Sequence, residues 1–509
     1  MRVAFRFLMA LLLAWPLAAQ ATWRRAETAS FIGYSRGSEK ELRTRLHELQ
    51  DFDTLLRLVT AVKAPPSEAK LPVFFIAGRD LKILGIADAQ VDGIYVSSPG
   101  LVYAAVATDR ASNSFSNGVN TALFHEYAHH FMFQYFTAAY PPWYVEGYAE
   151  YMSTATFKPG ETSFGSFDKG RAYQLIALPW MPMQTLLTAR RSDLKDAQVP
   201  AFYAQSWLTT HYLMRDAQRS KQLIAYLQLV AKGTPRDAAF TTAFGLGIPE
   251  FTKALRAYMT SKEFTHSRMT GAAAGPSPGD PVTAMTVLPP SADDLLIPAT
   301  RLSVIEGRDQ APALLDLVRT AAARYPGDAY AQAVLAEAEI KLGDRAAGLA
   351  LLDAQLAARP ADAQLLYLRG RAWLRDAVIA HRAGKDAGDL MKQARRALAA
   401  ANRARPDDYR ILFAHALASR EGRLPDAEMP VLLRAAELAP QVGEIAIVAA
   451  QALAARGDKA EARQLLTPVA NDPHEGPGSK RAAAMLAALD RNAAVDAGPE
   501  ETPDGEKDD

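Results

Sequence analysis

The sequence between positions 121 and 135 reads TALFHEYAHHFMFQY, and it contains the pattern H-E-x-x-H. Residues four positions apart lie on the same side of an α-helix, so His125 and His129 can present their imidazoles to one metal ion. Glu126 is adjacent but offset from both, where a carboxylate can act on water instead of binding the ion. Because the pattern is rare by chance in a chain of this composition, we interpret the segment as a helix with a catalytic metal site.

Two histidines do not complete a catalytic zinc site, which normally has three protein ligands. The sequence PPWYVEGYAEY at positions 141–151 supplies a candidate, because its prolines end one connection and a second helix can begin near Trp143. Glu146 lies 17 residues after His129, which lets the first helix end and the chain return a carboxylate to the metal. The chain has no cysteine, so any metal must be held by histidine and carboxylate side chains.

These two segments together resemble the gluzincin (peptidase MA-like) zinc peptidases, in which an E-G-x-A element follows H-E-x-x-H and provides the third ligand. The resemblance implies that Zn²⁺ is bound by His125, His129 and Glu146. It also implies that Glu126 is the general base. The metzincin pattern, which needs a third histidine shortly after H-E-x-x-H, is absent.

Glu150 lies one helical turn beyond Glu146 and on the same face. In thermolysin-like gluzincins an acid at this offset holds a ligand histidine through its second nitrogen, so the resemblance implies that Glu150 orients His125. The alternative for Glu150 is a solvated helix carboxylate. His130 points away from His129, and we interpret it as a packing residue.

Two residues are candidates for a donor to the oxyanion of the reaction. Tyr203 lies 57 residues after Glu146, and its place resembles the tyrosine that opens a helix downstream of the third ligand in the M-one aminopeptidases. The glycine and lysine that follow that tyrosine are missing here, and packing in a core is the alternative role. His211 is the other candidate donor, because a downstream histidine has this role in thermolysin-like enzymes.

The segment from 22 to 264 contains short strand-like runs followed by helical patterns. Apolar residues at helical spacing predict a helix within 39–62, and β-rich runs broken by glycine and proline lie at 72–77 and 93–107. From position 121 onward the pattern is helical, and strands followed by helices favour an α+β domain. We therefore predict an α+β zinc-peptidase (gluzincin-like) domain over residues 22–264.

Residues 101–107 form the predicted strand before the metal-binding helix, and this strand could pair with an extended polypeptide substrate. The stretch lacks the G-x-M-E-N sequence with which M-one aminopeptidases hold a free amino terminus. Cleavage within a polypeptide is therefore the preferred prediction, with an aminopeptidase as the alternative.

The second half of the chain is repetitive. Apolar helical segments are each followed by a proline, at Pro326, Pro360, Pro406 and Pro440, with spacings of 34, 46 and 34 residues. A 34-residue helix–turn–helix unit is the period of tetratricopeptide repeats, and the spacing of 46 predicts an insertion around 381–389. The resemblance to tetratricopeptide arrays covers residues 292–490 and implies an all-α domain that binds a protein partner. An irregular alanine-rich bundle is the alternative.

The segments that flank these domains differ in composition. Residues 265–291 are rich in proline, glycine and alanine and predict a linker. Residues 491–509 form an acidic tail, with seven acids and one lysine between positions 496 and 509, and this composition predicts disorder.

Residues 1–21 are typical of a cleaved export signal. Arg2 and Arg6 precede a short apolar run, and Ala19 and Ala21 provide the small residues of a cleavage site. The run is shorter than the ~20 residues of a membrane span, and an uncleaved anchor is the alternative. No other segment has an apolar run of sufficient length, so we expect a mature chain without an integral span. We expect export to a bacterial periplasm, with secretion as the alternative.

Composition narrows the class of function. A length of 509 residues predicts two or three domains. Lys and Arg number 57 against 56 Asp and Glu, and this balance gives no reason to expect nucleic acid as a partner. The leading hypothesis is an exported zinc-dependent peptidase that uses a zinc-activated water and Glu126, with repeats for protein interaction.

The alternative is an envelope binding or assembly protein whose zinc domain is catalytically inactive. The presence of Glu126 argues against it, because metal binding alone needs only the ligands. A purely architectural zinc would normally have four protein ligands, and the sequence identifies three.

Overall fold

The computed structural model describes residues 22–86, 91–109, 119–136, 140–261, 264–271, 274–305, 311–420, 423–472 and 477–491. The predicted export signal and the acidic segment from position 492 onward lie outside the described residues. None of the described helices is both long enough and apolar enough to span a membrane.

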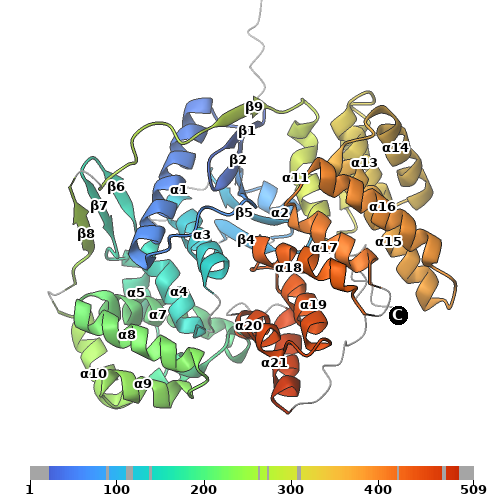
Figure 1. Cartoon of the computed structure of the whole chain (residues 1–509). Coiled ribbons are helices and arrows are strands. Elements are labelled where there is room, and N and C mark those ends of the chain that lie inside the picture. Colours follow the sequence, from blue (N-terminus) through green and yellow to red (C-terminus); the bar gives the residue numbers. More distant parts are fainter. Residues whose placement is uncertain are drawn as a thin grey trace, which may run out of the picture.

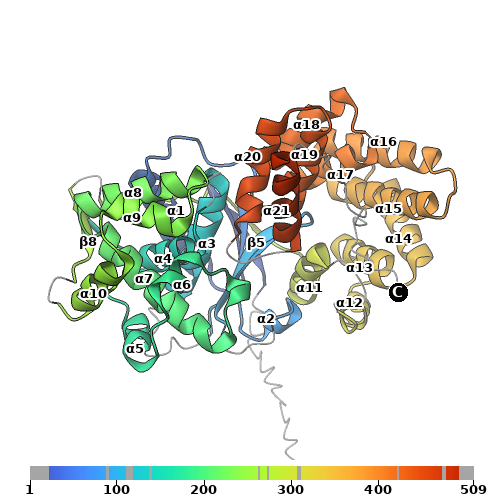
Figure 2. The same ribbon diagram turned by 90° about the horizontal axis from the view of Figure 1, so that it is seen from below.

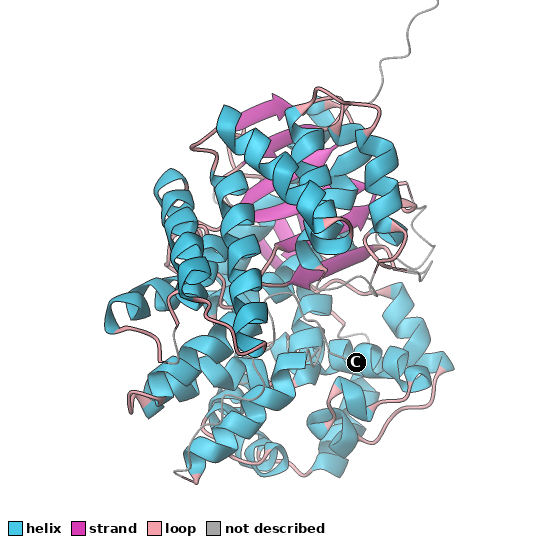
Figure 3. Cartoon of the chain, turned by 90° about the vertical axis from the view of Figure 1, so that its right-hand side faces the viewer, coloured by secondary structure: helices cyan, strands magenta, loops and turns pink. Residues whose placement is uncertain are grey.

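The first part of the chain builds a mixed six-stranded sheet in the order β4-β5-β3-β2-β1-β9. Its strands are β1 (Arg24–Glu27), β2 (Phe31–Ser35), β3 (Leu71–Ile76), β4 (Gly93–Ser97), β5 (Val102–Ala107) and β9 (Ala284–Val287). Strands β2, β3 and β5 are parallel to one another, whereas β1, β4 and β9 pair antiparallel with their neighbours. Figure 3 shows these strands as one layer with helices around it.

Successive side chains of β3 point to opposite faces of the sheet and belong to two different core clusters. Val73 and Phe75 belong to the cluster covered by α1 (Glu39–Thr60) and α3 (Val119–Tyr135). Phe74 and Ile76 belong to the opposite cluster, under α2 (Asp80–Ile83) and α11 (Ala292–Val304). A strand buried on both faces needs apolar residues at successive positions, which is why the sequence here is a continuous apolar run. The predicted strand runs are present, but the parallel strands with helices on both faces form an N-terminal α/β region and not the predicted α+β arrangement. The zinc-peptidase fold stays a prediction.

A helical layer follows the sheet and adds a small second sheet. Its helices are α4 (Pro142–Met152), α5 (Lys169–Ala177), α6 (Met183–Thr188), α7 (Val199–Met214), α8 (Ala217–Ala231), α9 (Arg236–Phe244) and α10 (Ile248–Met259), with short 3₁₀ turns at Arg191–Asp193 and Asp196–Gln198. The second sheet contains β6 (Thr156–Lys158), β7 (Glu161–Phe164) and β8 (Ser267–Thr270). Trp143, Trp207 and Phe240 are fully buried in the core of the layer.

The prediction that residues 265–291 form a linker is wrong. Strand β8 pairs with β7, and β9 pairs with β1 at the edge of the large sheet. His47 Nε2 also contacts the carbonyl of Ser277 at 3.0 Å. Backbone pairing needs only a few β-compatible residues, and two such stretches lie between the prolines and glycines that suggested a linker. The segment therefore adds one strand to each of the two sheets.

The prediction that residues 101–107 could pair with a substrate is also wrong. This strand, β5, is already paired on both sides, with β3 and β4. Among the described strands, β4 is the one that ends the sheet on this side.

The second half of the chain is a stack of helical hairpins (Figure 1). After α11 its helices are α12 (Leu314–Ala322), α13 (Ala329–Leu342), α14 (Arg345–Ala358), α15 (Ala363–Arg382), α16 (Gly388–Ala404), α17 (Tyr409–Ala418), α18 (Met429–Leu438), α19 (Gly443–Ala454), α20 (Lys459–Ala470) and α21 (Pro477–Asp490), with a 3₁₀ turn at Asp426–Glu428. Asp328, Asp362 and Asp408 follow the repeat prolines by two residues and cap α13, α15 and α17. The long spacing of 46 residues lengthens the α15–α16 hairpin.

Several parts of the repeat stack contact the α/β region. In α11, Asp293 accepts a hydrogen bond from the Trp23 backbone N–H at 3.2 Å. Farther along the stack, Arg434 of α18 forms an ion pair with Glu68, and Tyr409 of α17 lies close to the carbonyl of Ser98. Pro468 of α20 lines a cavity together with Met132 and Phe133 of α3, and Figure 2 shows α20 beside α3.

Candidate metal centre

Two buried helices carry the predicted metal ligands. In α3, Phe124 and Ala128 lie in the core shared with α1 and the sheet, where Phe124 stacks on Phe52 of α1 with ring centroids 4.2 Å apart. This packing turns the other side of α3, with its two histidines, toward α4. Helix α4 begins with Pro142 at its first position, where proline is well tolerated.

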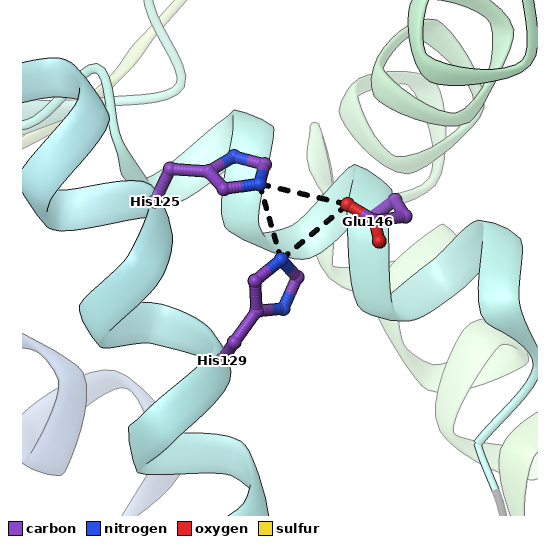
Figure 4. A group of neighbouring side chains, drawn as sticks. All are labelled: His125, His129 and Glu146. Atoms are coloured by element: carbon purple, nitrogen blue, oxygen red, sulfur yellow. Dashed lines mark hydrogen bonds and ion pairs between the residues drawn. The ribbon is translucent and has the colours of Figure 1, made fainter. Parts of the chain in front are cut away.

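Three donor atoms from these helices lie together (Figure 4). His125 Nε2 and His129 Nε2 are 3.1 Å apart, and Glu146 Oε2 lies 3.5 Å from the first and 3.4 Å from the second. Ligand atoms about 2.0–2.2 Å from a tetrahedral zinc ion lie roughly 3.3–3.6 Å from one another. The described side chains therefore fit one zinc ion without rearrangement.

The carboxylates around the cluster raise the pKa of His125. Burial disfavours the protonated imidazole, but the contact with Glu146 and the charges of two further carboxylates outweigh burial and raise the pKa of His125 to about 9. A zinc ion binds the neutral imidazole, so metal binding in this site would release a proton.

Gly147 allows α4 and α7 to approach each other closely. A Cβ atom at this position would lie 2.2 Å from Thr210 Oγ1 and 2.4 Å from the carbonyl oxygen of Ser206. The glycine of the E-G-x-A element therefore has a packing role that the sequence alone does not reveal.

We predict that Gly147→Ala lowers the free energy of unfolding by about 1–3 kcal/mol, because the added methyl group overpacks the contact between α4 and α7. Thermal denaturation checks this. Gly327→Ala is the control, since a Cβ atom there meets nothing within 4 Å. Equal melting temperatures for the two variants would contradict the packing role.

Glu150 lies on the Nδ1 side of the His125 ring. Its Oε1 is 3.5 Å from His125 Nδ1. Arg171 of α5 forms a bidentate pair with the same carboxylate. Its Nε donates to Oε2 at 2.9 Å, and its Nη2 donates to Oε1. Burial opposes ionisation of Glu150, but the Arg171 guanidinium and His125 outweigh burial and lower the pKa of Glu150.

Arg171 is a residue of the site that the sequence did not predict. It joins two predicted site residues, because its guanidinium carbon also lies 5.3 Å from the ring centre of Tyr203. Asp168 caps α5 and accepts a hydrogen bond from the Arg171 backbone. That cap could have predicted where α5 begins, but no spacing relates α5 to the H-E-x-x-H helix.

We predict that Arg171→Met weakens the affinity for Zn²⁺ about 10–100-fold, the usual cost of losing a group that orients a ligand. The change leaves the buried Glu150 carboxylate without its bidentate partner, so His125 is held less firmly. Competition with a chromophoric chelator measures the affinity.

Arg219→Met is the control for Arg171→Met, because Arg219 also pairs with an acid and lies over a tyrosine ring, but on α8. If both variants bind Zn²⁺ like the wild type, Arg171 only supports the fold.

Tyr203 lies at the cluster. Its ring centre is 6.4 Å from that of His125. The charge of Glu146, followed by burial, raises the pKa of Tyr203, which keeps its hydroxyl protonated and able to donate.

His211 is buried elsewhere in the helical layer. Its Nε2 contacts the carbonyl of Gly165 at 2.9 Å, and its Nδ1 contacts the Tyr258 hydroxyl at 2.8 Å. Burial lowers the pKa of His211 to about 4, so it is neutral and occupied by partners within the core. Of the two predicted donors, only Tyr203 has described contacts with the metal cluster.

Glu126 lies beside the edge strand of the large sheet. A Cβ atom at Gly93 of β4 would come within 3.8 Å of Glu126 Cγ. On the same strand, the Tyr95 hydroxyl is 3.0 Å from His130 Nδ1, and burial lowers the pKa of His130 to about 3. His130 is thus a buried neutral residue, in agreement with its interpretation as a packing residue.

In comparisons with known proteins, no family model and no curated protein matches this chain. Among solved structures, the chain is similar to a thermophilic tetratricopeptide-repeat protein of Thermus thermophilus. The two share 20% sequence identity with a TM-score of 0.31, over 39% of this chain and 98% of that one.

Proposed function

We propose that this chain is an exported zinc-dependent peptidase that cleaves within polypeptides. The observation that carries the proposal is the triangle of His125 Nε2, His129 Nε2 and Glu146 Oε2, with sides of 3.1–3.5 Å. Three protein ligands are the number typical of a catalytic zinc site, which keeps a fourth position for water or substrate. When bound, zinc would supply a Lewis acid that polarises a carbonyl and makes water more acidic.

The chain's own residues support hydrolysis around this cluster. Glu126 is adjacent to the ligand His125 but outside the triangle, so its carboxylate is available to take a proton from an attacking water. The protonated hydroxyl of Tyr203 can donate to the oxyanion that forms on the substrate carbonyl. Arg171 and Glu150 keep His125 in one orientation through the contacts described above.

A polypeptide is the substrate class that suits the surroundings of the cluster. Strand β4 lies beside Glu126 and ends the sheet among the described strands. An extended peptide could add to such an edge by backbone hydrogen bonds, which bind it independently of sequence. We propose that the repeat half binds a protein partner or the same substrate at a distance from the metal.

The test is metal analysis combined with hydrolysis of casein, an unstructured polypeptide. The purified protein should hold one zinc per chain, lose hydrolysis on chelation and regain it when zinc is restored. Glu146→Gln should lose zinc and hydrolysis together. One equivalent of zinc with no hydrolysis of any unstructured polypeptide would favour the alternative of an inactive zinc domain in a binding or assembly protein.

A further inference from the structure

A buried ion pair lies in the core between α1 and the metal-binding helix α3, which pack against each other (Figure 1). The Asp53 carboxylate accepts a hydrogen bond from Arg57 Nε at 2.8 Å, and both residues belong to α1. The Asp53 side chain is only 2% exposed, and the adjacent Phe52 lies in the apolar core. The loss of water offsets the attraction within such a pair, so stability alone does not explain its presence.

The ion pair holds α3 at two places. The Tyr127 hydroxyl donates to Asp53 Oδ1 at 2.6 Å, and the Arg57 guanidinium donates to the Tyr135 hydroxyl. Tyr127 lies in the middle of α3, and Tyr135 is the last residue of the helix. An offset of eight residues puts both tyrosines on the same side of a helix. Polar contacts therefore fix which side of α3 faces α1.

Tyr127 is placed to set the direction of the metal ligands. It lies between His125 and His129, two residues from each, and two residues correspond to a rotation of about 200° around the helix axis. Both ligand imidazoles therefore leave α3 on the side opposite the Tyr127 ring. A rotation of α3 moves both sides together, so a fixed Tyr127 hydroxyl limits the rotation of both imidazoles.

The other contacts of the Tyr127 ring are packing contacts. Its centroid lies 4.8 Å from that of Phe31 of β2 and 5.7 Å from that of His130. Packing contacts tolerate small rotations, whereas a short hydrogen bond to a carboxylate has a narrow range of lengths and angles. The bond to Asp53 is thus the directional contact of this ring.

The metal cluster is sensitive to the rotation of α3. Its three donor atoms are 3.1–3.5 Å apart, and the third of them belongs to Glu146 of another helix, α4. Rotation of α3 would shift both imidazole nitrogens relative to the Glu146 carboxylate. A working site must be held within about 0.5 Å of its productive geometry, so even a small rotation would weaken metal binding.

We propose that Asp53 and Tyr127 are positioning residues of the metal site, and that their buried hydrogen bond fixes the rotation of α3 about its axis. Arg57 orients the Asp53 carboxylate for this contact. The ligand triangle is thereby formed before the metal binds. The inference rests on the zinc site of the proposed function, but it does not depend on hydrolysis.

The test compares zinc affinity with fold stability in the full-length protein. Competition with a chromophoric chelator measures the affinity at a temperature where every variant is folded, and thermal denaturation of the metal-free protein measures stability. Tyr127→Phe keeps the ring and removes only the hydroxyl. It should weaken zinc affinity about tenfold, the lower end of the cost of losing a group that orients a ligand.

Replacement of the whole polar contact separates positioning from stability. Asp53→Leu combined with Arg57→Met and Tyr127→Phe leaves apolar side chains of similar size, and such replacements of a buried ion pair usually preserve stability. The metal-free triple variant should therefore melt near the wild type, while its zinc affinity falls at least about tenfold.

Two further variants control the comparison. Asp53→Asn with Arg57→Gln removes both charges but keeps an amide oxygen that can accept from the Tyr127 hydroxyl, so most of the zinc affinity should remain. Tyr325→Phe removes a hydrogen bond of the same kind in the repeat half, where the hydroxyl donates to Asp294 at 2.8 Å. This variant should bind zinc like the wild type.

Three results would count against the inference. Wild-type zinc affinity in both Tyr127→Phe and the triple variant would overturn it and leave the zinc site intact. An equal loss of affinity in Tyr325→Phe would mean that zinc binding follows general stability, which would also overturn it. If the wild type itself binds no zinc, the proposed function fails and this inference fails with it.

Discussion

Glu126→Gln should lower casein hydrolysis about 10²–10⁴-fold while the zinc content stays at one per chain. The range is that expected for loss of general acid–base catalysis. Glutamine has nearly the same shape but cannot take a proton from the attacking water. The three donor atoms of the cluster come from His125, His129 and Glu146, so the substitution leaves the metal ligands intact.

The measurement pairs metal analysis with initial rates of casein hydrolysis. Glu39→Gln is the matched control, since Glu39 begins α1 and its side chain is 57% exposed. Wild-type hydrolysis by Glu126→Gln would refute the assignment of the base. Loss of zinc in this variant would instead mean that Glu126 helps to hold the metal.

The candidate site was predictable from the sequence where it depends on local helix geometry. The offset of four residues places His125 and His129 on one side of α3, and the structure places their Nε2 atoms 3.1 Å apart. The structure places the carboxylates of Glu146 and Glu150 each 3.5 Å from a ring nitrogen of His125. Their roles as metal ligand and orienting group stay predictions.

The contribution of Arg171 could not be predicted. It comes from α5, which packs against α7, and only the tertiary fold relates α5 to α4. A partly buried arginine that joins Glu150 to Tyr203 has no sequence signature, because neither spacing nor composition records which helices become neighbours.

The same contrast between local and long-range interactions applies to the predictions of the fold. Repeat prolines and capping aspartates act within one hairpin, so the sequence revealed the helical stack in the second half. Strand pairing acts over long separations: β9 pairs with β1, which begins the sheet some 260 residues earlier. Glycine and proline around β8 and β9 suggested a linker. Local composition cannot show that these short stretches pair with strands that are distant in the sequence.

Tyr203→Phe should lower kcat about 10²–10³-fold, the usual cost of losing one donor to an oxyanion. KM should change little, because the hydroxyl would bond chiefly to the oxyanion of the transition state. Phenylalanine keeps the ring under the Arg171 guanidinium, so folding and zinc content should remain normal.

Two comparison variants separate this role from packing. Tyr212→Phe removes a hydroxyl from the same helix, where it accepts from Arg219 at 3.0 Å, and should leave kcat unchanged. His211→Ala should lower the melting temperature, since it deprives the buried Tyr258 hydroxyl of its 2.8 Å contact. If Tyr203→Phe stays within about twofold of the wild type and His211→Ala loses kcat with zinc retained, the donor is His211 and Tyr203 only packs against the site.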